Sequence, residues 1–143
     1  MPDVNDEARL REAIELLYFA YREFTAGPDR ILAERGLNRV HHRILYFIGR
    51  NDAVSVSELL AILDVTKQAL HGPLRKLVRL DLVSNEPSAH DRRVKQLRLT
   101  TSGRRLERRL TGTQMALLGD VFATAGTPAT QGWREVMAAL GHR

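Results

Sequence analysis

The 143-residue chain contains no cysteine. Disulfide scaffolds, thiolate zinc sites and cysteine nucleophiles or redox sensors are therefore excluded. The chain also lacks a long run of apolar residues, so no segment is expected to span a membrane. Residues 1–7 are acidic and lack the basic-then-apolar order of a signal peptide, and we therefore expect a cytoplasmic protein.

Signatures of catalysis are missing as well. The chain has no glycine-rich phosphate loop, no Ser-x-x-Lys motif and no nucleophile elbow. The adjacent His41 and His42 would point about 100° apart on a helix, so they cannot easily share one metal ion. We expect neither an enzyme nor a metal centre, and no cofactor.

The charge of the chain is distributed unevenly. Its net charge of +5 is only a weak indication of a polyanionic partner. Residues 66–109, however, contain twelve basic and four acidic residues, a net charge of +8, and the remainder of the chain carries −3. Such a concentration is typical of a DNA-binding face. The alternative is that these basic residues only solvate their helices.

Apolar periodicity predicts a helix at the beginning of the chain, over about residues 6–25, where apolar residues recur at spacings of three and four. Gly27 and Pro28 are expected to break or redirect this helix, and residues 29–35 to form a short helical turn.

The rest of the chain predicts more helices and one hairpin. Helices are expected over residues 38–50, 57–63, 67–80, 101–125 and from Thr127 onward, with caps at Asn38, Ser57, Thr66 and Thr100 or Thr101. Residues 54–56 form at most a stub of strand. Period-two alternation over residues 82–86 and 94–99 predicts two strands that are joined by a basic loop.

A helix-turn-helix followed by a hairpin is a winged helix. The predicted fold is therefore mainly α, an α+β winged helix with a two-stranded β-hairpin wing. Residues 37–100 are predicted to form the DNA-binding domain of one compact chain. The flanking helices, in residues 1–36 and 101–143, have little left to cover in a chain of this size, so we expect them to pair with a second copy.

Three segments resemble the MarR family of winged helix-turn-helix regulators. Residues 91–103, DRRVKQLRLTTSG, are similar to the family's wing signature. Residues 56–60 (VSELL) and 65–70 (VTKQAL) are similar to the starts of its two helix-turn-helix helices. The resemblance is strongest over residues 38–110.

The resemblance implies a homodimeric transcriptional regulator, usually a repressor, that binds a pseudo-palindromic operator in double-stranded DNA. Many members release DNA when a small aromatic or phenolic molecule binds between the dimerisation helices and the winged helix. The alternative function is a winged-helix module for protein interaction that lacks sequence-specific DNA binding.

The candidate DNA-binding residues lie at the starts of two helices, along the recognition helix and on the wing. Helix starts favour phosphates, the first turn of the recognition helix enters the major groove, and basic wing tips suit the minor groove. The candidates are Ser55, Ser57, Thr66, Lys67, Gln68, Ala69, His71, Arg75, Lys76, Asp91, Arg92, Arg93 and Lys95.

These candidates have different expected roles. Gln68 can pair with adenine, and Lys67 can reach guanine or a phosphate. Arg75 and Lys76 are placed for phosphates. As in the family, Asp91 is expected to pair with an arginine and fix the loop. For Ser55 and Ser57 the alternative is plain helix capping, and for His71 it is an exposed polar residue without a partner.

Two residues depart from the expected pattern. Pro73 removes an N–H from the recognition helix, so either the helix bends or loosens there or it starts later than Lys67. Asp81 stands where the family usually has glycine, before the first wing strand, and Asp accepts a left-handed backbone less readily.

Four residues are candidates for a ligand pocket: Tyr18, Arg43, Tyr46 and Phe47. Tyr46 could donate a hydrogen bond to a phenolate or carboxylate, and Arg43 could neutralise it. The alternative is that the aromatic residues among them only pack in the core.

Overall fold

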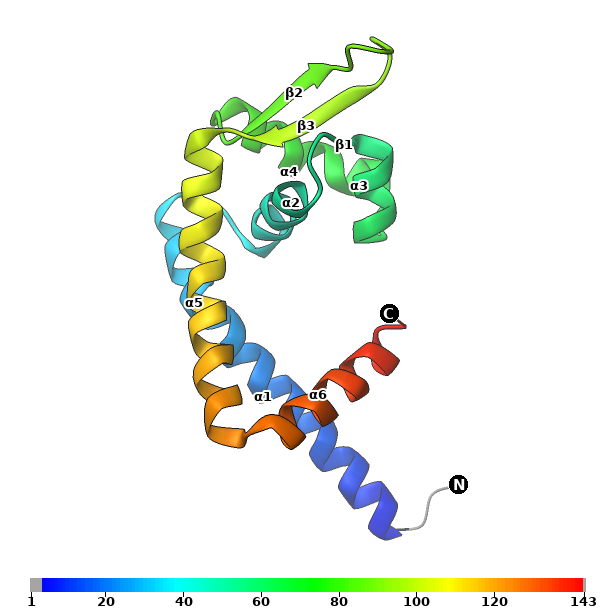
Figure 1. Cartoon of the computed structure of the whole chain (residues 1–143), viewed down its shortest axis with the longest axis vertical. Helices are drawn as coiled ribbons and strands as arrows, with labels where there is room; N and C mark the ends of the chain where they lie inside the picture. The colour runs from blue at the N-terminus through cyan, green and yellow to red at the C-terminus, as the bar shows by residue number, and fades with distance from the viewer. Residues whose placement is uncertain (1–3, 143) are drawn as a thin grey trace.

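The computed structural model describes residues 4–142, and its helices and strands form an elongated molecule (Figure 1). Their order is α1 (Val4–Glu34), α2 (Arg39–Arg50), β1 (Val54–Ser55), α3 (Val56–Leu63), α4 (Lys67–Arg79), β2 (Val83–Pro87), β3 (Lys95–Leu99), α5 (Thr101–Ala125) and α6 (Thr127–Leu140). α2 to β3 form a winged helix at one end, and α1 and α5 lie side by side below it (Figure 1).

The strands form one antiparallel sheet with the order β1-β3-β2. The hairpin of β2 and β3 was predicted, and Val83 pairs with Leu99 in it. β1 is the stub of strand that the sequence allowed over residues 54–56, and it adds to the other edge of β3, where Val54 pairs with Leu97. β1 has only two residues, which is too short to show alternation in the sequence.

The predicted break at Gly27 and Pro28 is wrong, since α1 continues through both residues. Proline in a helix leaves the carbonyl four residues earlier without its N–H donor. That carbonyl belongs to Phe24, and the side-chain amide of Gln114 on α5 donates to it at 3.3 Å. A Cβ atom on Gly27 would lie 3.2 Å from the Thr113 hydroxyl, so Gly27 permits close packing of α1 on α5.

The cap of α3 is Ser55, and the prediction of Ser57 was wrong. The Ser55 hydroxyl accepts from the Glu58 N–H at 3.1 Å, and the Glu58 carboxylate accepts from the Ser55 N–H at 3.1 Å. This reciprocal capping box begins the helix at Val56. Ser57 is exposed in the first turn.

The recognition helix α4 begins at Lys67, as predicted, so the alternative of a later start is wrong. The Thr66 hydroxyl caps it by accepting from the Ala69 N–H at 3.1 Å. The helix runs through Pro73 to Arg79. Asp81 adopts the left-handed backbone, with φ +59°, in the turn between α4 and β2.

All the buried hydrophobic side chains of the described residues lie between residues 32 and 110, which we call the head. They include Leu45, Leu59, Leu77, Leu97 and Leu106. By contrast, residues 6–23 are exposed throughout, and α6 has no buried residue. We call residues 6–23 and 115–140 the arms. None of the described helices is long and apolar enough to cross a membrane.

Candidate nucleic-acid interface and ligand cavity

The recognition helix α4 separates a buried side from an exposed side. Leu70, Leu74 and Leu77 pack into the core of the head. The exposed side includes the predicted residues of the first turn and beyond: Lys67, Gln68, Ala69, His71 and Arg75. An exposed face on the second helix of a helix-turn-helix is the part that enters the major groove.

A groove between α4 and β2 extends this face by two residues that the sequence analysis missed. It has a volume of about 440 Å³ and is lined by Lys67, His71, Arg75, Arg79 and Asn85, among others. The first four residues recur at intervals of four, so they form one row along the helix. That spacing in the sequence could have identified Arg79 as part of this groove. Asn85 could not be found in this way, because only the fold brings β2 beside α4.

The wing consists of β2, β3 and the loop of residues 88–94 between them. In this loop Asp91 Oδ1 accepts from the Arg93 backbone N–H at 3.0 Å and from its guanidinium Nε at 3.2 Å. These hydrogen bonds hold the pKa of Asp91 below its usual range. Asp91 thus pairs with an arginine, as the resemblance implied. The Arg93 side chain remains 90% exposed, and Arg92 and Lys95 are exposed as well.

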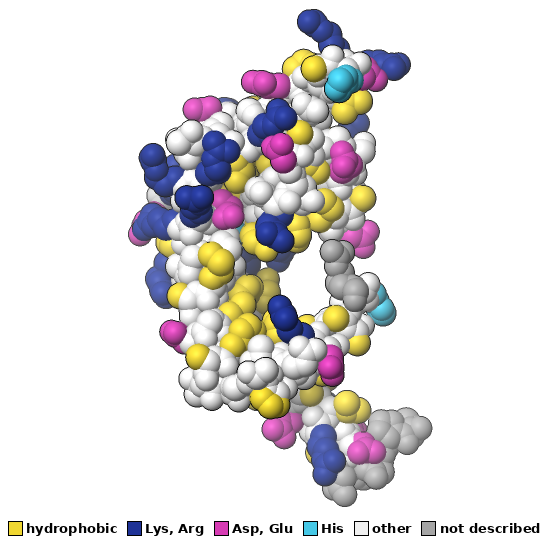
Figure 2. Space-filling view, in the orientation of Figure 1, with side chains coloured by type: hydrophobic (Ala, Val, Ile, Leu, Met, Phe, Trp, Pro, Cys, Tyr) yellow, Lys and Arg dark blue, Asp and Glu magenta, His cyan; other side chains and the backbone are white. Residues whose placement is uncertain are grey.

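The side chain of Lys76 points away from the exposed side of α4. Its ammonium donates a hydrogen bond to the Gly36 carbonyl, in the connection between α1 and α2. Lys76 is half-buried, whereas Arg75 and Arg79 are exposed. Figure 2 shows further basic side chains at the tip of the wing and on the side of the molecule where α5 begins.

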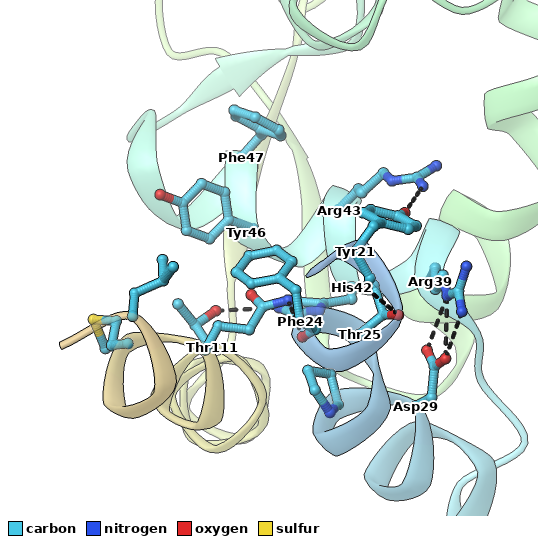
Figure 3. Close-up of a pocket in the computed structure, with 14 residues that line it drawn as sticks. Tyr21, Phe24, Thr25, Asp29, Arg39, His42, Arg43, Tyr46, Phe47 and Thr111 are labelled. Atoms are coloured by element: carbon cyan, nitrogen blue, oxygen red, sulfur yellow. Dashed lines mark hydrogen bonds and ion pairs between the residues drawn. The ribbon is translucent and has the colours of Figure 1, made fainter. Parts of the chain in front are cut away.

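A cavity of about 370 Å³ lies at the junction of head and arms, between α1, α2 and α5 (Figure 3). Three of the four predicted pocket residues line it: Arg43, Tyr46 and Phe47. Tyr18 does not, because it lies in an exposed turn of α1, with its ring edge against Phe19. Residues from distant segments complete the lining: Tyr21, Phe24, Thr25, Pro28, Asp29, Arg39, His42, Thr111, Gln114, Met115 and Leu118.

The polar groups of the cavity form pairs across the junction (Figure 3). Arg39 makes an ion pair with Asp29 at 2.9 Å, which raises the pKa of the guanidinium. Arg43 donates to the Tyr21 hydroxyl at 3.1 Å. Arg39 is thus already neutralised, and Arg43 is the cationic lining residue that has no acidic partner among the described residues.

His42 is the buried titratable group of this cavity. Its Nε2 lies 3.2 Å from the Thr111 hydroxyl of α5. Burial lowers its pKa, the charge of Arg43 lowers it further, and Asp29 partly offsets both effects. His41 points elsewhere, and its Nδ1 accepts from the Asn38 N–H at 3.0 Å. Within residues 4–142 no group of three or more His, Asp or Glu side chains is arranged to hold a metal ion.

Comparisons with known proteins identify the family. The MarR family profile matches residues 35–94. The HTH-type transcriptional regulator PetP of Rhodobacter capsulatus is 40% identical over 134 residues, which cover 94% of this chain and 81% of that protein.

Solved structures match the whole architecture. FabT of Streptococcus pneumoniae in complex with DNA has a TM-score of 0.75 at 19% identity, over 98% of this chain and 96% of that one. MarR of Staphylococcus aureus in complex with salicylate and kanamycin has a TM-score of 0.76 at 22% identity, over 96% and 93%. These structures show the fold, and the family profile together with the 40% identical relative shows that the chain belongs to the MarR family of DNA-binding transcriptional regulators.

Proposed function

We propose that two copies of the chain pair through their arms and bind a pseudo-palindromic operator as a repressor. The observation that carries this proposal is a basic head joined to arms whose apolar side chains are uncovered. In the arms these exposed side chains are Leu10, Ile14, Leu16, Leu17, Tyr18, Phe19, Tyr21, Met115, Leu117, Val121, Trp133, Val136 and Leu140. Apolar side chains exposed in such number favour an interaction site.

In this proposal each head occupies one half-site. Lys67 and Gln68, at the start of α4, face base edges in the major groove, and Arg92 and Arg93 reach the flanking minor groove. Ser57, Arg75 and Arg79 contact phosphates, which position the protein without reading sequence. Two-fold pairing places the half-sites roughly one helical turn apart, about 34 Å.

We further propose that a small aromatic or phenolic ligand occupies the cavity and causes release of DNA. The aromatic rings of Phe24, Tyr46 and Phe47 suit a flat ring, and Arg43 suits its carboxylate or phenolate. The cavity touches α1 and α5 from the arms and α2 from the head. A ligand there therefore contacts both regions and can shift one relative to the other only by binding the two arrangements unequally.

Selection of bound sequences from random DNA, followed by mobility shifts at two salt concentrations, tests the DNA part. We expect a palindromic consensus and binding that weakens steeply with salt, because Lys and Arg displace counterions from phosphates. Recovery of random sequence, or of a single half-site bound by a monomer, would contradict the proposal and favour a protein-interaction module.

Salicylate is a suitable first probe of the cavity. We expect calorimetry to detect its binding, and Arg43→Met to weaken that binding at least about fivefold, since a charge-assisted hydrogen bond is lost. Arg50→Met, on the same helix but outside the cavity lining, is the matched control. Binding that is equal in both variants would remove Arg43 from the site, and displacement of DNA by salicylate tests the repressor mechanism.

A further inference from the structure

Adjacent basic residues of α4 have different environments. Arg75 and Arg79 are exposed, and within residues 4–142 neither makes a side-chain hydrogen bond or ion pair. Lys76 is half-buried, and its ammonium donates to the Gly36 carbonyl, forty residues earlier in the chain. The sequence analysis treats Arg75 and Lys76 as equivalent phosphate ligands, and only the fold separates them.

The segment that receives this hydrogen bond ends the longest helix of the chain. At the end of α1 the Leu37 N–H donates to the Leu32 carbonyl at 2.9 Å, and Gly36 takes the left-handed backbone with φ +67°. The last turn of α1 contains no basic residue. A cation near the C-terminus of a helix offsets the partial negative charge of its free carbonyls. Lys76 brings such a cation to this end from another helix, in addition to Arg35, which follows α1 directly.

The positive charge of Lys76 also affects the pKa of His41, at the same connection. His41 is buried, and its Nδ1 accepts from the Asn38 backbone N–H at 3.0 Å. Burial lowers the pKa of His41, and the positive charge of Lys76 lowers it further. The Lys76 ammonium therefore lies over the segment of residues 36–41 and not over the exposed side of α4.

We propose that Lys76 is a positioning residue that ties α4 to the connection between α1 and α2, and that it contacts no phosphate. The tie fixes the orientation in which α4 presents Gln68 and Arg75. This inference rests on the proposed role of α4 in DNA binding. The ion pair of Asp29 and Arg39 crosses the same connection and lines the cavity, so a ligand that separates this pair acts on the segment that Lys76 holds.

The salt dependence of DNA binding distinguishes a tie from a phosphate contact. Each lost phosphate contact lowers the slope of log K against log salt by about 0.9. We expect Lys76→Met to weaken binding to a selected duplex roughly twofold to tenfold, the equivalent of one net hydrogen bond, with an unchanged slope. Arg75→Met, the matched control, should reduce the slope by about 0.9. A reduced slope in Lys76→Met, or unchanged affinity, overturns the proposal.

A measurement on the free protein separates this inference from the proposed function. In Lys76→Met we expect the NMR-detected pKa of His41 to rise and the amides of α4 to exchange faster, whereas Arg75→Met changes neither. If the wild-type protein binds no DNA, the proposed function fails, and these two readouts still decide whether the tie exists. Unchanged values in Lys76→Met overturn it.

Discussion

The head and the arms both contain many apolar side chains on helices, but these side chains have opposite environments. Sixteen hydrophobic side chains of the described residues are buried, and all sixteen lie between residues 32 and 110. In the arms Ile14 is 67% exposed and Val136 is 61% exposed. The head therefore obtains its stability from contacts within one chain, whereas the arms have exposed apolar side chains, which a second copy covers in the proposed dimer. Folding and assembly are separate properties of the two regions, and mutations should separate them.

Two polar contacts cross the junction between the two regions. Gln114 donates to the Phe24 carbonyl that Pro28 leaves free, and His42 contacts Thr111. Polar pairs are directional and lose strength quickly when their geometry changes. Polar contacts of this kind, beside a cavity, are better suited than a continuous apolar core to a change in the arrangement of the arms relative to the head.

The largest expected effect on the head comes from Gly103, in the first turn of α5. A Cβ atom there would lie 1.9 Å from the backbone carbonyl oxygen of Leu82, and backbone cannot move aside as a flexible side chain can. We expect Gly103→Ala to lower the free energy of unfolding by roughly 3 kcal/mol or more, as measured by urea denaturation.

Gly112→Ala is the matched control, because it lies on the same helix and a Cβ atom there would meet nothing within 4 Å. Since alanine favours helix more than glycine does, this variant should be neutral or more stable by up to about 1 kcal/mol. If both variants lost the same free energy of unfolding, the clash with the Leu82 carbonyl would not be the cause.

For the arms, Ile14→Glu should abolish pairing and leave the head folded. A carboxylate in an apolar interface loses its hydration without gaining a partner, so we expect the dimer dissociation constant to rise by about a hundredfold or more. Sedimentation at several concentrations measures this constant, and the far-UV spectrum shows whether the helices of the head remain.

Arg9→Glu introduces the same carboxylate at an exposed position of α1 that already carries a charge. It should leave the dimer intact. If Ile14→Glu instead unfolded the head, the separation of folding from assembly would be wrong.

How much the sequence predicts also differs between regions. Helix starts were predicted correctly where a single capping side chain sets them. Asn38 and Thr66 cap their helices as predicted. The predicted break at Pro28 was wrong because the residue that satisfies the freed Phe24 carbonyl, Gln114, lies ninety residues from Phe24 in the chain. The stub of strand over residues 54–56 was expected, but its pairing was not, since its partner β3 is distant in the chain.

The candidate site shows the same limit. The basic character of α4 and the wing follows directly from composition, and Arg43, Tyr46 and Phe47 do line one cavity. Tyr18 was predicted because it is aromatic, but residue type does not show where along α1 the cavity ends. The direction of the Lys76 side chain depends on the Gly36 carbonyl, which no local pattern contains.

An intermediate effect should distinguish the two regions in DNA binding. Arg93 in the head and Arg11 in the arm are both exposed and both paired with a nearby carboxylate, of Asp91 and Glu7 respectively. We expect Arg93→Ala to weaken operator binding by roughly 1–3 kcal/mol and Arg11→Ala to have little effect. Titrations by fluorescence anisotropy at one salt concentration compare them, and equal effects would remove the wing from the interface.

The smallest expected effect concerns the junction and its dependence on pH. Burial lowers the pKa of His42, so the folded protein keeps its imidazole neutral while the unfolded chain takes up a proton below about pH 6.5. The corresponding stability is present above the unfolded pKa and is lost as the pH falls toward the folded pKa.

His42→Gln retains a polar group for Thr111 but cannot titrate. Urea denaturation between about pH 7 and about pH 5 should therefore show a smaller loss of stability in this variant than in the wild-type protein. Some loss should remain, because His41 also has a lowered pKa. If both proteins lost the same stability, the imidazole of His42 would already be accessible to protons in the folded state, and the junction would be looser than its contacts indicate.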